Sequence, residues 1–269
     1  MDDENSKINK LWNSESRVYL IKLLRPIFGY ETEKTLRNII NNNDKTILLK
    51  LHEIYRKQKY YNYNPNYASI KRAKNTADNI CYLIPYNLRY NLVKYLDIGS
   101  ENSDMPLAIA NKLGTKYINC INIKNWQSTY QLNQNLEDRF LNLINFMYYD
   151  GVNIPFQNSS LDLITILMVL HHVEKLDNLL KNIHRVLKKN GLLIIKEHDV
   201  GNDNLAKIID IEHYKYDTIY FGKYVDKLDT NYYSFDDMKN IIVKNGFKMI
   251  KYMKFNNTTK SYFCLFMKL

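Results

Sequence analysis

From residue 92 onward, short apolar runs alternate with stretches of helical periodicity, and this alternation constrains the fold more than any other feature. The expected strands are 92–98, 117–123, 144–148, 161–167, 191–196, 247–255 and 261–267. The expected helices are 106–113, 131–141, 176–187 and 235–245. Strand–helix alternation of this length predicts an α/β fold with a doubly wound, mostly parallel, seven-stranded sheet. Because only the polar segment 256–259 separates the last two strands, we expect them to form an antiparallel hairpin at one edge.

The first 90 residues follow a different pattern. Apolar residues recur at helical spacing through 14–57, and another helix is expected at 70–83. Residues 1–95 hold 17 basic and 9 acidic residues, while the formal net charge of the whole chain is +10, so most of the basic excess lies here. We therefore expect a helical, basic N-terminal extension over residues 1–90 and a sheet domain over residues 91–269.

The segment 56–74 contains no acidic residue and interleaves cations with tyrosines. Cations neutralise phosphates and aromatic rings stack on bases, so this mixture suits single-stranded nucleic acid such as RNA. The alternative is a solvated basic loop whose tyrosines pack on the domain. The candidate nucleic-acid-binding residues are Arg56, Lys57, Lys59, Tyr61, Lys71, Arg72 and Lys74.

The cysteine spacing and the lack of a long apolar segment indicate the cellular compartment of the protein. Cys81, Cys120 and Cys264 are scattered without a CxxC pair, which argues against a disulfide framework or structural zinc and fits a reducing environment. No run of about 18 apolar residues exists, and the amino terminus is acidic and polar, unlike a secretory signal. We expect a soluble, cytoplasmic protein with no metal site and no membrane association.

A candidate cofactor loop follows the first expected strand. A strand that ends in an acid and turns through glycine into a helix is typical of sites for nucleotide-like cofactors. With a single glycine, the same residues also suit an ordinary strand-to-helix turn. The residues are Tyr95-Leu96-Asp97-Ile98-Gly99-Ser100.

Further motifs follow in order along the sheet domain. They are Asp150-Gly151, Asn153-Ile154-Pro155-Phe156, Ser160-Leu161-Asp162-Leu163-Ile164, Leu170-His171-His172-Val173, Ile183-His184-Arg185-Val186-Leu187-Lys188 and Gly191-Leu192-Leu193-Ile194-Ile195. In order, spacing and residue type, this series resembles the class I S-adenosylmethionine-dependent methyltransferases, in particular the methyltransferase type 11-like subgroup. The likeness covers residues 92–200 and extends to the final strands. It implies a Rossmann-like methyltransferase fold with S-adenosyl-L-methionine as the cofactor.

The resemblance assigns Asp97, Gly99 and Ser100 to the loop beside the methionine and ribose portions of the cofactor. The family has two further glycines in this loop, and Glu101 and Ser103 stand in their place. A glycine there lets the backbone approach the ligand without a Cβ between them. The sequence therefore departs from the family pattern at the point where the cofactor approaches most closely.

The resemblance assigns four more residues to the cofactor. Asn122 falls where the family usually has an acid that bonds the ribose hydroxyls, and an amide can make that bond without the charge. Asp150 and the Gly151 amide fall beside the adenine. Leu167, at the end of the fourth expected strand, falls under the methyl-bearing sulfonium.

Three ionisable residues close together follow the fifth expected strand, in the sequence Lys196-Glu197-His198-Asp199. Ligands in doubly wound sheets bind outside the carboxyl ends of the strands. We therefore predict that His198 and Glu197 are catalytic and orient the acceptor or take its proton. The alternative is a polar strand-to-loop junction that bonds its own turn.

Three functions remain open at this point. The first, and the one we predict, is a methyltransferase that acts on RNA, with the basic segment guiding the strand. The second is a methyltransferase of a small molecule or lipid, with residues 14–90 as a helical lid. The third is a non-catalytic subunit that lends its surface to a protein partner. Abundant Asn, Lys, Ile and Tyr, all with A/T-rich codons, suggest an A/T-rich source, either a large DNA virus or an A/T-rich microbe.

Overall fold

A computed structural model describes residues 25, 34, 65–100, 103–123, 144–201, 205–206, 209–210, 212–213, 230–255 and 260–269. Apart from Arg25 and Lys34, the helices expected at 14–57 and 131–141 lie outside these residues. The chain divides into two compact units. One comprises 64–199, 230–255 and 261–269 and contains the sheet, and the other comprises 1–63, 200–229 and 256–260.

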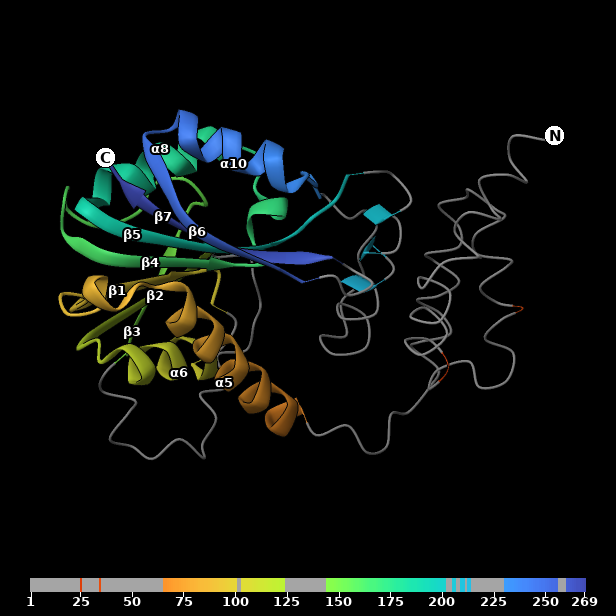
Figure 1. The fold of residues 1–269 in the computed structure, drawn as a ribbon, viewed down its shortest axis with the longest axis horizontal. Helices are drawn as coiled ribbons and strands as arrows, with labels where there is room; N and C mark the ends of the chain where they lie inside the picture. The colour runs from red at the N-terminus through yellow and green to blue at the C-terminus, as the bar shows by residue number, and fades with distance from the viewer. Residues whose placement is uncertain are drawn as a thin grey trace. The chain divides into compact units, whose positions relative to one another are not determined.

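Seven strands form one sheet in the order β3-β2-β1-β4-β5-β7-β6 (Figure 1). Their bounds are β1 Lys94–Ile98, β2 Tyr117–Ile123, β3 Ile144–Tyr149, β4 Leu161–Leu167, β5 Leu187–His198, β6 Phe247–Phe255 and β7 Ser261–Lys268. The first five strands pair in parallel, and β7 runs antiparallel between β5 and β6. This arrangement confirms the predicted α/β class, the mostly parallel sheet and the hairpin at its edge.

Helices cover both faces of the sheet. Their bounds are α5 Pro65–Leu83, α6 Asp104–Leu113, α8 Leu176–Val186 and α10 Phe235–Lys244, with short 3-10 turns η2 at Tyr86–Leu88 and η3 at Leu170–His172. In Figure 1, α8 and α10 lie on one face and α5 and α6 on the other. Helix α5 begins earlier than the expected residue 70, since proline at the first helical position loses no hydrogen bond.

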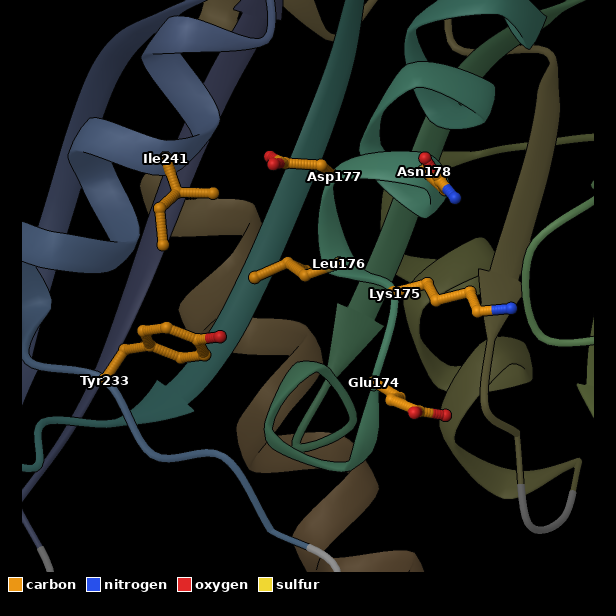
Figure 2. Close-up of a pocket in the computed structure, with 7 residues that line it drawn as sticks. All are labelled: Glu174, Lys175, Leu176, Asp177, Asn178, Tyr233 and Ile241. Atoms are coloured by element: carbon orange, nitrogen blue, oxygen red, sulfur yellow. The ribbon is translucent and has the colours of Figure 1, made fainter.

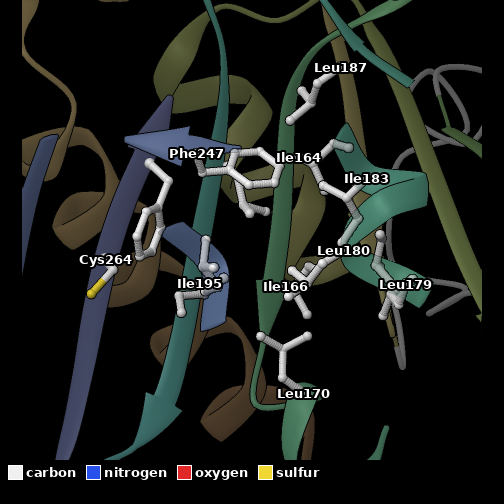
Figure 3. Packing of buried hydrophobic residues seen from close by; sticks show 14 of the residues in the cluster. Ile164, Ile166, Leu170, Leu179, Leu180, Ile183, Leu187, Ile195, Phe247 and Cys264 are labelled. Carbon is white, nitrogen blue, oxygen red and sulfur yellow. The ribbon is translucent and has the colours of Figure 1, made fainter. Parts of the chain in front are cut away.

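The central strand β4 is buried on both faces, which explains its predominantly apolar sequence. Ile164 and Ile166 point to the α8 and α10 side, where they pack with Leu180 and Phe247 (Figure 3). Leu163 points to the opposite side and joins the cluster under α5 and α6. The two clusters share no buried residue, so the sheet separates two layers of core.

Helix α5 belongs to this core although it precedes the predicted boundary at residue 91. Its buried side chains Ala77, Ile80 and Leu83 pack in the same cluster as Leu107 of α6 and Phe263 of β7. The N-terminal extension expected over residues 1–90 stays a prediction for the part outside the described residues.

Strand β5 is longer than the expected 191–196. Leu187, directly after α8, already pairs with Leu161, and a register shift follows before Leu192 pairs with Leu163. Lys188 forms an ion pair with Asp162, with Nζ 2.6 Å from Oδ1. The polar side chains at this end of β5 gave no hydrophobic signal for a strand.

Asp162 is the polar interruption in the apolar run of β4. Its Oδ2 accepts hydrogen bonds from the backbone amides of Val93 at 3.1 Å and Lys94 at 2.8 Å. The carboxylate therefore fastens the amino end of β1 to the amino end of β4, far along the chain.

Among the helices that the structure describes, none combines the length and the apolar character needed to span a membrane.

Candidate cofactor and acceptor site

The chain reverses its winding direction between β1 and β4, which are neighbours in the centre of the sheet. Helix α6, which follows β1, and helix α8, which follows β4 and η3, cover opposite faces. Connections that leave neighbouring strands toward opposite faces open a crevice outside the carboxyl ends of those strands. The predicted site residues are distributed around these ends.

Asp97 is the penultimate residue of β1 and lies in a buried network of hydroxyl groups. Ser100 Oγ donates to Asp97 Oδ2 at 2.5 Å, and Thr165 of β4 donates to Oδ1. The Tyr95 hydroxyl lies 2.7 Å from Thr165 Oγ1 and 3.4 Å from Asp97 Oδ1. The Asp97 carboxylate therefore joins β1, β4 and the loop after β1.

Burial raises the pKa of the Asp97 carboxyl from 3.8 to about 6, although hydrogen bonds from Ser100, Thr165 and Tyr95 act in the opposite direction. A carboxyl with this pKa exchanges its proton near neutral pH. Its neighbourhood is thus sensitive to mild acidification.

Gly99 turns the chain after β1 with a φ of +85°, which favours glycine. A Cβ at this residue would lie only 2.3 Å from Cγ2 of Val169, in the turn after β4. The Gly99 amide donates to Ile121 O of β2 at 2.8 Å. Conformation and space together require glycine here.

Ser103 replaces a family glycine, yet its backbone does not need one. Its φ of −79° is ordinary for any residue, and it stands just before helix α6. The substitution at this position therefore causes no backbone strain. Glu101, at the other replaced glycine, lies outside the described residues.

Asn122 lies near the carboxyl end of β2 and is buried. Its Nδ2 donates to Ser100 O at 3.0 Å, and its Oδ1 accepts from the amide of Ile123 at 2.8 Å. An amide oxygen can accept two hydrogen bonds and an amide nitrogen can donate two, so each group keeps capacity for a ligand. The side chain ties the Ser100 loop to β2.

Asp150 follows β3 and is exposed. Its Oδ1 accepts from the amides of Val152 and Asn153 at 2.8 and 2.6 Å, and Asn153 Nδ2 donates to Oδ2 at 2.5 Å. These bonds from Asn153 and Val152 hold the pKa of Asp150 below its ordinary value. The loop therefore presents an ionised carboxylate, and Gly151 follows it with a φ of +87°.

The predicted catalytic pair lies at the carboxyl end of β5, and both residues are buried. The oxygens of Glu197 accept bonds from the turn after β4 and from the ring of His171. The ring of His198 lies 5.8 Å from that of His171, centroid to centroid. Their assignment as catalytic residues stays a prediction.

The predicted nucleic-acid-binding residues divide into two groups. Lys71, Arg72 and Lys74 are exposed on α5. The remaining four, Arg56, Lys57, Lys59 and Tyr61, lie outside the described residues. Leu167, predicted under the sulfonium, is half-buried at the end of β4.

A hollow of about 290 Å³ lies between the start of α8 and helix α10. Figure 2 shows Leu176 and Asp177 from the α8 side facing Tyr233 and Ile241. None of the predicted cofactor-binding or catalytic residues lines this hollow.

Residues 96–195 match a family model described as a methyltransferase domain. This segment is therefore similar to a methyltransferase domain. The match covers β1 through most of β5 and includes the Asp97, Asn122 and Asp150 positions. It confirms the predicted resemblance and implies S-adenosylmethionine as the cofactor.

Two relatives carry methyltransferase names. A demethylmenaquinone methyltransferase from Staphylococcus haemolyticus is 28% identical over 127 residues, which cover 44% of this chain and 53% of the relative. A ubiquinone/menaquinone biosynthesis C-methyltransferase from Blochmanniella pennsylvanica is 26% identical over 177 residues, which cover 61% and 68%. The chain spans about half the length of the first relative. Neither relative is viral or named for RNA, so these relatives lend no support to those expectations.

A solved structure of an S-adenosylmethionine-dependent methyltransferase from Aquifex aeolicus has a TM-score of 0.51 and 13% sequence identity. The likeness covers 84% of this chain and 99% of that one. At this identity the comparison concerns the fold alone, and it agrees with the sheet described above.

The residues present fit S-adenosylmethionine. The ribose hydroxyls and the adenine amino group of this cofactor are hydrogen-bond donors, and Asn122 Oδ1 and the Asp150 carboxylate are acceptors at the ends of neighbouring strands. Gly99 has no side chain, so the backbone of the turn after β1 can approach a ligand closely. The oxygens of Asp97 hold the loop through Ser100 and Thr165, and the assignment of Asp97 beside the cofactor stays a prediction.

Sequence reasoning missed three residues that shape the site. Thr165 is a polar residue inside a buried strand, which is a usable signal for an internal hydrogen bond. His171 belongs to the motif Leu170-His171-His172-Val173, but the sequence does not show that its ring bonds the Glu197 carboxylate. Val169 gave no signal, because its neighbour Gly99 is 70 positions away along the chain.

We predict that Gly99→Ala destabilises the protein more than Gly114→Ala, by about 1–3 kcal/mol. Both glycines have positive φ, but a Cβ at Gly114 meets nothing within 4 Å, whereas a Cβ at Gly99 meets Val169. Urea denaturation of the two variants isolates the steric effect. Equal losses would show that Val169 moves aside without cost.

We also predict a pH-dependent difference between wild type and Asp97→Asn. Between about pH 4 and pH 6 the raised pKa makes the folded state bind the Asp97 proton more tightly than the unfolded chain. As the pH rises through this window, the wild type should lose about 2–3 kcal/mol of unfolding free energy relative to the variant. Urea denaturation at several pH values measures this, and parallel pH profiles would contradict it.

Proposed function

We propose that the protein is an S-adenosylmethionine-dependent methyltransferase that acts on a small-molecule acceptor. The observation that carries this proposal is the methyltransferase domain over 96–195, with Gly99, Asn122 and Asp150 at the carboxyl ends of three neighbouring strands. These two hydrogen-bond acceptors and the glycine turn support a cofactor site at the carboxyl ends of the strands.

The bound cofactor supplies an activated methyl group on a sulfonium. In the proposed mechanism, Asn122 accepts from the ribose hydroxyls and Asp150 from the adenine amino group. Asp97 holds the Ser100 loop in place through its hydroxyl network. Since the methyl group is already activated, positioning and the exclusion of water supply most of the rate enhancement asked of the protein.

The names of the two relatives support a small-molecule acceptor, because both refer to quinone methylation. Aromatic side chains gather near the ends of β4 and β5: the His171 ring stacks on Tyr232 with centroids 5.7 Å apart, and the His198 ring lies 5.8 Å from that of His171. We keep His198 as the candidate base for the acceptor proton. Glu197 is a candidate for support of that region, since its oxygens are already bonded.

RNA is the second candidate acceptor. It rests on the exposed cations Lys71, Arg72 and Lys74 of α5. A phosphate-binding surface of this kind predicts affinity that falls steeply with salt. A non-catalytic role with a protein partner is the remaining alternative, and the acceptor screen below tests it.

We predict that Asp150→Ala weakens the binding of S-adenosylhomocysteine roughly tenfold, because it removes the acceptor for the adenine amino group. Asn153→Ala is the matched control: it removes the bond to Asp150 Oδ2 but leaves the carboxylate. Isothermal titration calorimetry on the three proteins measures the difference. Wild-type affinity in Asp150→Ala would remove this residue from the site.

We predict methyl transfer from labelled cofactor to a quinone precursor and none to RNA. Both acceptors should be screened with the full chain, at low salt for RNA. Transfer to RNA alone would reverse the choice of acceptor, and cofactor binding without transfer to any pool would favour the non-catalytic role. With an acceptor in hand, His198→Ala should lower turnover by about 10²–10⁴-fold if His198 is the base.

A further inference from the structure

One carboxylate holds three consecutive residues of the turn after β4. Glu197 Oε1 accepts hydrogen bonds from the backbone amides of Val169 at 2.9 Å and Leu170 at 2.7 Å. Its Oε2 lies 2.6 Å from Nδ1 of His171. Glu197 is only 2% exposed, so these bonds are shielded from water.

The turn that Glu197 holds has an unfavourable backbone. Met168 has a φ of +61°, which costs free energy for a residue with a side chain. Such a conformation persists only where surrounding bonds fix it. The Met168 amide donates to Lys196 O at 2.8 Å, and the next two amides donate to Glu197, so β5 supplies all three acceptors.

The same turn forms one wall of the Gly99 loop. The Val169 side chain fills the space beside Gly99 where any other residue would carry its Cβ. The position of Val169 therefore fixes how far the Gly99 loop can move toward β4. A displacement of the turn would change the shape of the loop that meets the cofactor.

Glu197 holds the turn as a carboxylate. Burial by itself raises the pKa of its carboxyl, but the charge and the hydrogen bond of His171, with His198 and the Leu170 amide, hold the net pKa below the ordinary value. A buried charge is tolerated where partners satisfy it, and here three donors do so. An ionised Glu197 also requires the proton of His171 to lie on Nδ1.

We propose that Glu197 is a positioning residue of the cofactor site: it fixes the turn after β4, and through Val169 it fixes the Gly99 loop. This inference rests on the proposed cofactor binding. It gives Glu197, which the sequence predicts to act on the methyl acceptor, a role in cofactor affinity. The chain of contacts runs from β5 to the β4 turn and from there to β1.

Amide hydrogen exchange in the cofactor-free protein tests the first link. In Glu197→Gln, exchange at Val169 and Leu170 should be about tenfold faster, because an uncharged acceptor bonds them less strongly. Asp199→Asn is the matched control, since that carboxylate bonds Phe235 N and Lys254 and not the β4 turn. Unchanged exchange in Glu197→Gln would overturn the proposal whether or not the protein binds the cofactor.

The affinity for S-adenosylhomocysteine tests the second link. Glu197→Gln and Val169→Ala should each bind it about tenfold more weakly, and the double variant should bind no more weakly than the worse single variant, since both act through one contact. Val169→Ala keeps the Glu197 bonds, so its amide exchange should stay slow. Unchanged affinity in Val169→Ala would overturn the proposal even if Glu197→Gln failed to fold.

A variant destabilised elsewhere separates positioning from general stability. Asp162→Ala loses two amide bonds and an ion pair at the amino end of β4, far along the strand from the turn. It should unfold more easily yet bind S-adenosylhomocysteine like the wild type. If Asp162→Ala and Glu197→Gln lost affinity equally, the positioning role would be wrong. No binding by the wild type would count against the proposed function and leave the exchange test standing.

Discussion

The buried carboxylate of Asp97 is the interaction on which the geometry of the site depends. A buried charge without partners costs several kcal/mol, and here Ser100 and Thr165 supply the donors. Those bonds fix the loop after β1 against β4. The backbone carbonyl of Ser100 in turn accepts a hydrogen bond from Asn122 Nδ2, which ties β2 to the same loop.

A second buried carboxylate, Glu197, does for the turn after β4 what Asp97 does for the loop after β1. The two turns meet where Val169 packs on Gly99. Each acid therefore fixes one turn at the carboxyl ends of the central strands. Asn122 and Asp150, which keep capacity to accept further hydrogen bonds, lie at the ends of β2 and β3. The hydrogen bonds of these two carboxylates therefore fix the loop after β1 and the turn after β4, although the loop after β1 has fewer glycines than the family pattern.

The fold was predictable because burial imposes a pattern on the sequence. The core of β4, buried on both faces, reads as apolar, and helices between such strands force a parallel sheet. The first residues of β5 were not predictable, since Lys188 is stabilised there by Asp162 across the sheet. Sequence spacing placed Glu197 at the correct end of a strand, but its bonding partners depend on contacts 26 to 28 positions away.

A crystal structure of the full chain with S-adenosylhomocysteine tests the central claim most directly. The account predicts ligand density across the carboxyl ends of β1, β2 and β3, with the ribose at Asn122, the adenine at Asp150 and the β4 turn still bonded to Glu197. Density at another surface of the sheet unit, or none under saturating ligand that binds in solution, would contradict it.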